Sequence, residues 1–446
     1  MFGSLLSLWV GLSLVPGDAA PGDETTADAN PRALAVSSPT AVVAPPVVAP
    51  PVDTAVAEDP VVATRVGTPA ASEPSAPPKP PILERQLQCD EEPPHLWDGF
   101  KIASEDEQHS LKFGFLGQLR ATVHDAQGAD PQGAMAVRLA RPTLVAQLWR
   151  GRVAMRFMPE FAGANADLLD AAATVKTDND VVGIQFGQFR PWLSRGYRTG
   201  LPVQGLPGRG PIVDRFRVDR DVGITVRGKP WDGKLEYYVG VLNGAGRNST
   251  TLAPSPLLTA RVVVSPLGPV PYTQTPYARD VGPRSDDRAD GPHNDLAVAI
   301  GGSAYTVANR ETLELSADDV RRTSPRRRWG ASGDFVVSKR RVFGLAEGFY
   351  EHREGFANVS IPAQDAWGVY GQAGFLVWNP YLDVSMRVGL LSDFDRDIVP
   401  IEPGFNVYLF GNHAKLQVSY RCDVALEGAT SGCASHAGTL QAQLLF

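Results

Sequence analysis

The sequence concentrates arginine in one stretch, residues 190–220, which contains seven arginines and only two acidic residues, Asp214 and Asp219. The arginines are Arg190, Arg195, Arg198, Arg209, Arg215, Arg217 and Arg220. A guanidinium stays charged at neutral pH and offers a rigid fork of donors that fits phosphate and carboxylate groups. The stretch therefore predicts a site that attracts anions and repels cations.

The segments around this stretch are predicted to be β-strands. In 181–195, 219–228 and 234–246, apolar residues alternate with polar or small ones, which is the period of a strand with one apolar face. Residues 230–233 (PWDG) form a tight turn between the second and third strands, whereas about 25 residues join the first and second. A short turn at one end and a long loop at the other is typical of an outer-membrane barrel.

Three motifs in these strands, GQFRPWLS, RDVGITVRG and YYVGVLNGAG, have a familiar order and spacing. They resemble the phosphate-selective porin family (O and P type) of Gram-negative outer membranes, and the resemblance extends through most of 110–446. It implies that 190–220 folds into the lumen and narrows it, and that the protein is a homotrimer. We expect at least half of the loop arginines to line water. Few lysines lie on the predicted lumen faces, so general anion preference is favoured over phosphate specificity.

The alternation of strands with short turns and long loops continues to the end of the chain. It predicts an all-β fold, a transmembrane antiparallel barrel of about sixteen strands over 109–446. A barrel of this size leaves a water-filled lumen. Longer joins are expected at 309–327, 353–365, 393–401 and 423–436. Residues 266–293 are expected to be a long periplasmic connection, with a calcium site at its aspartates as the less favoured alternative. Four further arginines lie on the polar faces of predicted strands and are expected to point into the lumen. They are Arg120, Arg152, Arg156 and Arg227.

Tryptophan placement favours two interfacial belts, where an amphipathic ring is best accommodated. One belt lies at tight turns and the other at strand ends that face long loops. The first comprises Trp149, Trp231 and Trp378, and the second comprises Trp192, Trp329 and Trp367. The chain ends in Phe446, and a terminal Phe on a final strand resembles the recognition signal of the barrel assembly machinery.

The N-terminal region has a different composition. Residues 1–20 contain a short apolar run and a small-residue cleavage site, which predict a signal peptide, although no basic residue precedes the run. Residues 21–108 are rich in Pro and Ala, and 1–100 holds 17 of the 38 prolines, which predicts a disordered periplasmic linker. Residues 1–100 also carry 13 acidic and 4 basic residues, which leaves 36 of the 49 acidic and 38 of the 42 basic residues to the barrel. Nothing in this balance suggests nucleic-acid binding.

Cysteine usage suits an exported protein. Cys422 and Cys433 fall in one predicted outer loop, so a disulfide is favoured over free thiols, and over a metal site that includes His436. Cys89 would then be unpaired. No cofactor is expected.

No nucleophile, zinc, P-loop or dinucleotide motif is present, so the chain is not expected to be an enzyme. The predicted function is an outer-membrane porin for phosphate or other small anionic solutes, surrounded by membrane lipid and lipopolysaccharide. The alternative is a structural barrel that tethers the envelope through its Pro-rich segment.

Overall fold

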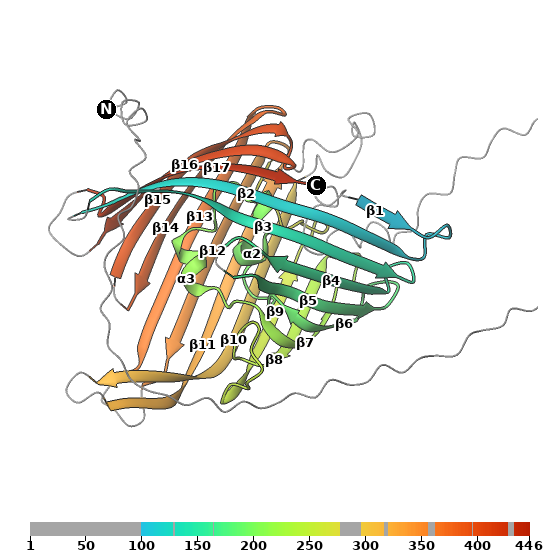
Figure 1. Ribbon diagram of the computed structural model, residues 1–446, viewed down its shortest axis with the longest axis horizontal. Helices are drawn as coiled ribbons and strands as arrows, with labels where there is room; N and C mark the ends of the chain where they lie inside the picture. The colour runs from blue at the N-terminus through green and yellow to red at the C-terminus, as the bar shows by residue number, and fades with distance from the viewer. Residues whose placement is uncertain are drawn as a thin grey trace, which may run out of the picture. The chain divides into compact units, whose positions relative to one another are not determined.

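The computed structural model shows a closed antiparallel β-barrel (Figure 1). It describes residues 100–127, 130–163, 165–276, 296–315, 320–355, 362–394, 396–426 and 432–446. The predicted signal peptide, Cys89, most of the predicted linker and the proposed tether lie outside the described residues. Within the described ranges, no helix is long and apolar enough to cross a membrane.

The barrel consists of sixteen strands, β2 to β17, as the alternation predicts. Their bounds are β2 Ser110–Ala126, β3 Gln132–Leu148, β4 Val153–Glu160, β5 Asp167–Lys176, β6 Gly183–Phe189, β7 Asp221–Gly228, β8 Leu235–Leu242, β9 Ser255–Val264, β10 Ala297–Leu315, β11 Val320–Lys339, β12 Val342–Arg353, β13 Gln364–Trp378, β14 Leu382–Asp393, β15 Arg396–Phe410, β16 Ala414–Ala425 and β17 Ser435–Leu445. Each strand pairs antiparallel with the next, and the pairing of β17 with β2 closes the ring.

Three boundaries differ from the prediction. The predicted linker ends in a short strand, β1 (Phe100–Ala103), which pairs with the start of β2. The predicted loop 309–327 is largely strand, because the β10–β11 ladder continues to the pair Leu315↔Val320. The predicted loop 393–401 is a tight turn, and β15 runs through Pro400 and Pro403. A proline removes only its own N–H from a ladder, so the strand persists around it.

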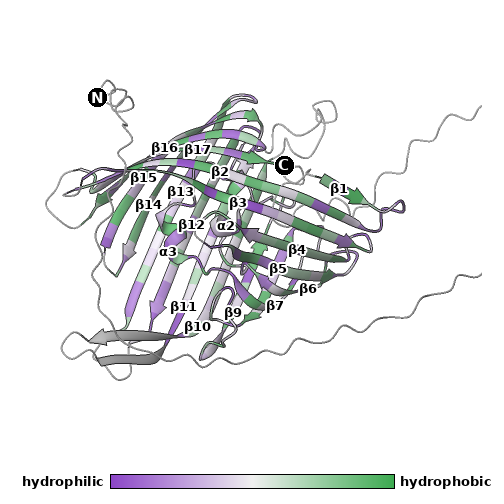
Figure 2. Ribbon diagram, viewed as in Figure 1, coloured by the Kyte–Doolittle hydropathy of each residue, from purple (hydrophilic) through white to green (hydrophobic). Residues whose placement is uncertain are grey.

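The faces of the barrel are inverted relative to a soluble sheet. Along β13, every second residue is buried, and Figure 2 shows hydrophobic residues recurring along the strands. Outward-facing Val369 and Phe375 are 46% and 47% exposed, whereas inward-facing Gln372 is 3% exposed. Apolar side chains directed outward and polar ones directed inward are the arrangement of a barrel in lipid.

Five of the six predicted belt tryptophans are exposed, at two levels. Trp149, Trp231 and Trp378 lie at or beside the tight turns. Trp367 lies near the opposite end of its strand, β13, and Trp329 lies in the middle of β11, which continues beyond the predicted strand end. The prediction for Trp192 is wrong, because its ring is buried and stacks on Tyr238 with centroids 4.0 Å apart. Trp192 lies in residues 190–220, which turn inward after β6 and are called the inserted segment from here on.

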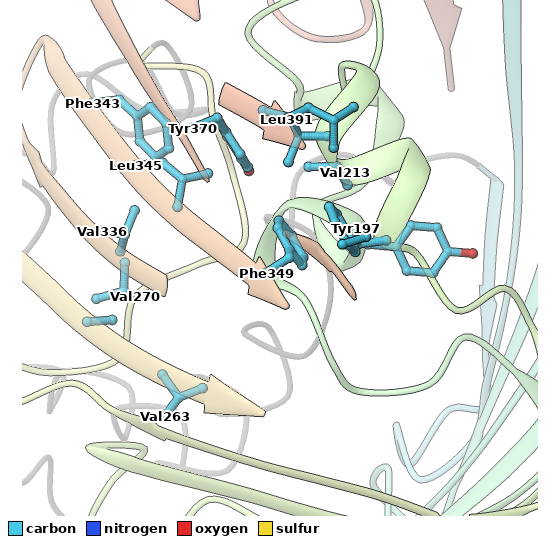
Figure 3. Packing of buried hydrophobic residues seen from close by; sticks show 14 of the residues in the cluster. Tyr197, Val213, Val263, Val270, Val336, Phe343, Leu345, Phe349, Tyr370 and Leu391 are labelled. Atoms are coloured by element: carbon cyan, nitrogen blue, oxygen red, sulfur yellow. The ribbon is translucent and has the colours of Figure 1, made fainter. Parts of the chain in front are cut away.

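An apolar cluster fills part of the barrel interior along β9 to β15 (Figure 3). The inserted segment contributes Tyr197, Val213 and Phe216 to this cluster. They pack against residues of the barrel wall such as Phe349 and Tyr370. The rings of Phe216 and Phe349 stack at 5.3 Å. The expectation of a water-filled interior is therefore wrong for this side, because the inserted segment carries its own apolar side chains into the lumen.

Candidate functional site

Residues 190–220 lie inside the barrel, where Figure 1 shows two short helices within the ring of strands. The helices are α2 (Arg195–Arg198) and α3 (Pro211–Phe216), separated by the 3₁₀ turn η4 (Leu201–Val203). The backbone of the segment accepts hydrogen bonds from the wall: Asn406 Nδ2 donates to the Gly205 carbonyl at 2.9 Å, and Lys415 Nζ donates to the Gln204 carbonyl at 3.1 Å. The segment therefore reaches from β6 to β15 and β16.

Local chemistry fixes both helices. Ser194 caps α2 by accepting from the Tyr197 amide, and the Glu347 carboxylate of β12 accepts from the amides of Arg195 and Gly196 at 2.8 and 3.0 Å. A carboxylate there satisfies amides that the helix itself leaves free. Gly210, with φ 82°, precedes Pro211 at the start of α3, where the missing proline N–H has no cost.

A second segment, residues 265–276, also enters the lumen. Arg195 Nη2 donates to the carbonyls of Val270 and Pro271 at 3.0 and 2.9 Å, and its guanidinium lies 4.4 Å from the Tyr272 ring centre. The Gln274 amide donates to the Val203 carbonyl at 2.9 Å. The expectation of a purely periplasmic connection is therefore wrong for this part. The rest of it, including Asp286, Asp287 and Asp290, lies outside the described residues.

Three arginines of the inserted segment are paired with carboxylates. Arg215 lies 2.7 Å from Asp393 and 3.2 Å from Glu351, and Arg220 lies 2.6 Å from Asp170. The exposed Arg217 lies 3.2 Å from Asp214. Burial opposes the charge of Arg220, but Asp170, Tyr197 and Asp219 together outweigh it and raise the pKa of this guanidinium.

The other four arginines lie against aromatic rings or carbonyls. Arg198 lies 3.5 Å above the Trp192 ring, and both Arg190 and Arg209 lie about 5 Å from the Tyr197 ring. Burial, followed by the charge of Arg190, lowers the pKa of Arg209 well below its usual value. Four of the seven loop arginines are less than a tenth exposed, and these are Arg195, Arg198, Arg209 and Arg220. The prediction that at least half line water is wrong, because rings, carbonyls and acids cover them.

Two wall arginines are held by amides instead. On β2, Arg120 donates through Nε and Nη2 to Oε1 of Gln441, at 3.0 and 2.7 Å. On β3, Arg138 Nη1 donates to Oε1 of Gln118 at 2.9 Å. Both arginines are half-buried, and within the described ranges neither forms an ion pair.

Sequence reasoning missed Arg138 because of a bulge. The β2–β3 register passes from Gln118↔Leu139 to Leu119↔Val137, so no residue of β2 lies directly opposite Arg138 in the ladder. An extra residue of this kind re-aims its side chain and reverses the alternation beyond it. Arg141, three residues further, pairs with Glu160 and was also missed.

The three remaining predicted lumen arginines have different positions. Arg156 points inward from β4, 4.0 Å from Asp170. Arg227 on β7 is buried, 4.8 Å from the Trp192 ring centre. The prediction for Arg152 is wrong, because it lies in the turn before β4, exposed and paired with Asp178. A residue in a turn belongs to neither face of the sheet.

The described cysteines, Cys422 at the outer part of β16 and Cys433 just before β17, are joined by a disulfide with Cα atoms 5.5 Å apart. His436 instead contacts Tyr420. Among the described residues, no group of His, Cys, Asp or Glu could hold a metal ion.

Comparisons with known proteins identify the fold. No family model and no curated protein matches the chain. The chain is similar to OprB of Pseudomonas putida, with 9% identity, a TM-score of 0.50, and 76% and 95% of the two chains covered. It is similar to OmpF of Salmonella typhi, with 11% identity, a TM-score of 0.50, and 78% and 100% covered. The outer membrane channel DcaP of Acinetobacter baumannii matches with 13% identity, a TM-score of 0.49, and 78% and 99% covered. What this chain shares with OprB and OmpF is the fold of the closed β-barrel.

Proposed function

We propose that this protein is an outer-membrane porin whose channel prefers anions. The observation that carries the preference is the pair Arg120 and Arg138, which are half-buried in the lumen and held by glutamine oxygens rather than by carboxylates. The arginines of the inserted segment contribute less, since acids neutralise some of them and rings or carbonyls cover others.

The magnitude of the effect depends on how close an anion passes. At an effective dielectric of ~20 and a separation of about 5 Å, one unpaired guanidinium attracts a monovalent anion by about 3 kcal/mol before screening. Salt weakens this attraction where the charge is open to bulk water, but less in a narrow passage. Two such groups on neighbouring strands would bias a channel strongly toward anions.

The test is the reversal potential of single channels in planar bilayers under a potassium chloride gradient. The wild type is expected to be anion-selective. Arg120→Gln combined with Arg138→Gln should lower the chloride-to-potassium permeability ratio at least several-fold. Arg152→Gln is the matched control, because it removes an equal charge that lies in a turn and is already paired with Asp178. A cation-selective wild type, or a double variant that behaves like the control, contradicts the proposal.

Narrower proposals come from the family resemblance alone. Phosphate is the candidate solute, and it should then reduce the chloride current at concentrations where sulfate does not.

A homotrimer should appear at three times the monomer mass in detergent-solubilised samples. Removal of Phe446 should reduce insertion into the outer membrane without preventing synthesis. Residues 1–20 and the Pro-rich stretch after them are proposed as a cleaved signal and a periplasmic linker, which N-terminal sequencing of the mature protein and protease access would test.

A further inference from the structure

A row of five directly opposed side chains crosses five adjacent strands, β2, β17, β16, β15 and β14. We call it the amide row; it consists of Arg120, Gln441, Gln417, Asn406 and Asp383. Each member faces the next across one strand pair, so the row follows a single register line around the wall. A cation begins it, three neutral amides continue it, and an anion ends it.

The hydrogen bonds of the row all run in one direction. Gln441 accepts from Arg120 and donates to Gln417 Oε1 at 2.9 Å, and Gln417 donates to Asn406 Oδ1 at 2.7 Å. Asn406 then donates to the Asp383 carboxylate. Reversing one amide would place donor against donor, so the order fixes which end of Gln441 faces Arg120.

A shorter relay positions Arg138 in the same way. Gln118 accepts from Arg138 and donates to Gln443 Oε1 at 2.8 Å, and Gln443 donates to the carbonyls of Asn412 and Pro202 at 2.6 and 3.2 Å. The last of these carbonyls belongs to the inserted segment. Both relays therefore end on fixed groups rather than in water.

The inserted segment covers both relays. Gln441, Gln118 and Gln443 are each 2% exposed, and Gln417 is fully buried. The carbonyl of Pro207 accepts from Arg120, and that of Gln204 accepts from Gln417 at 3.1 Å. Buried and hydrogen-bonded through both oxygen and nitrogen, these amides cannot rotate freely, so the two guanidinium groups have defined positions.

We propose that Gln441 and Gln118 are positioning residues for anion selectivity, an inference that rests on the proposed function. They give Arg120 and Arg138 neutral acceptors, so that each guanidinium is held in place and its charge stays available to a passing anion. A glutamate has almost the same shape but would cancel the charge that it holds. The choice of amide over carboxylate at these two sites therefore sets the selectivity.

The experiment compares two substitutions at each glutamine by reversal potential, with Arg120→Gln as the reference. Gln441→Glu should lower the chloride-to-potassium permeability ratio at least as far as the reference does. Gln441→Met removes the acceptor but leaves the charge of Arg120, so Arg120 loses its fixed position: the ratio should fall, but less than with Gln441→Glu, while current noise rises. Gln118→Glu and Gln118→Met should repeat this contrast through Arg138, which provides a second reading if a substitution at 441 impairs folding.

Gln185→Glu on β6 is the matched control, because Gln185 is also buried but bonds to Trp192 rather than to either arginine. It should change the ratio less than Gln441→Glu does. Glutamate variants that keep the wild-type ratio, while Arg120→Gln lowers it, overturn the inference and leave the proposed function intact. Methionine variants that lower the ratio as much as glutamate also overturn it, because the effect is then structural. A wild-type channel without anion preference refutes the proposed function itself.

Discussion

Two sides of the lumen hold their arginines by different chemistry. Along β2, β3 and β17, Arg120 and Arg138 bond to glutamine side chains. Along β5, β12 and β14, Arg215 and Arg220 bond to Asp170, Glu351 and Asp393. We call these the amide-held side and the carboxylate-held side. Both geometries fix a guanidinium, but only the first does so without a carboxylate in direct contact with it.

The lumen arginines have two different roles, anchoring the inserted segment and attracting anions, and the number of arginines alone does not distinguish them. On the carboxylate-held side, ion pairs anchor the inserted segment to the wall and prevent buried cations from being left unpaired. On the amide-held side, the arginines belong to the wall itself and the segment covers the amides that support them. Seven arginines in 190–220 therefore indicate where the segment is anchored, and two arginines outside it supply the proposed selectivity.

The largest expected effect follows from breaking the carboxylate-held side at Asp170→Asn. Arg220 is 7% exposed and would lose the charge that compensates it, which costs about 3 kcal/mol or more for a buried pair. Arg156, 4.0 Å from Asp170, would lose this ion pair as well. The free energy of unfolding, followed by Trp fluorescence in urea with lipid vesicles, should fall by that amount, and the anion preference should rise. An unchanged stability would show that this ion pair does not anchor the segment, and Asp178→Asn in the exposed turn is the matched control.

The sequence predicts the strands well because strand alternation is local. Strands such as β9, β12 and β13 alternate between exposed and inward-facing residues, and tight turns such as residues 230–233 are marked by Pro, Asp and Gly. The predicted strand ends are wrong where two strands stay paired through a polar stretch that resembles a loop, as in the β10–β11 ladder. Residue type alone does not reveal how far two strands stay paired.

The site is much less predictable, because its contacts join distant parts of the chain. Arg215 and Asp393 are 178 residues apart, and Arg120 and Gln441 are 321 apart, so no local pattern links them. A bulge of one residue re-aimed Arg138, and the inward turn after β6 took Trp192 from the expected belt into the lumen. The excess of arginine indicated the correct segment, whereas the partner of each arginine required the fold.

A smaller effect is expected at the outer end of the amide-held side, where the disulfide Cys422–Cys433 joins β16 to the start of β17. These strands also carry Gln417 and Gln441. Replacing both cysteines by serine should lower the free energy of unfolding by about 2–3 kcal/mol, the entropy expected for a closed loop of this length. Urea titration of both proteins measures it. The permeability ratio should not change, since the amide row has its own hydrogen bonds, and a large change would mean that the disulfide helps to position Arg120.

The smallest expected effect tests a cation that belongs to neither side. Arg195 is 2% exposed, donates to the carbonyls of Val270 and Pro271, and faces the Tyr272 ring. Arg195→Met keeps the approximate length of the side chain but removes its charge and its hydrogen bonds, at a cost of about 1.5–3 kcal/mol for hydrogen bonds from a charged donor. Residues 265–276 should then be held less firmly, so open-channel noise should increase. The reversal potential should stay at the wild-type value, because a covered cation exerts little force on an ion in the water-filled path. A shift as large as that of Arg120→Gln would show that covered arginines also select, and the distinction between the two sides would fail.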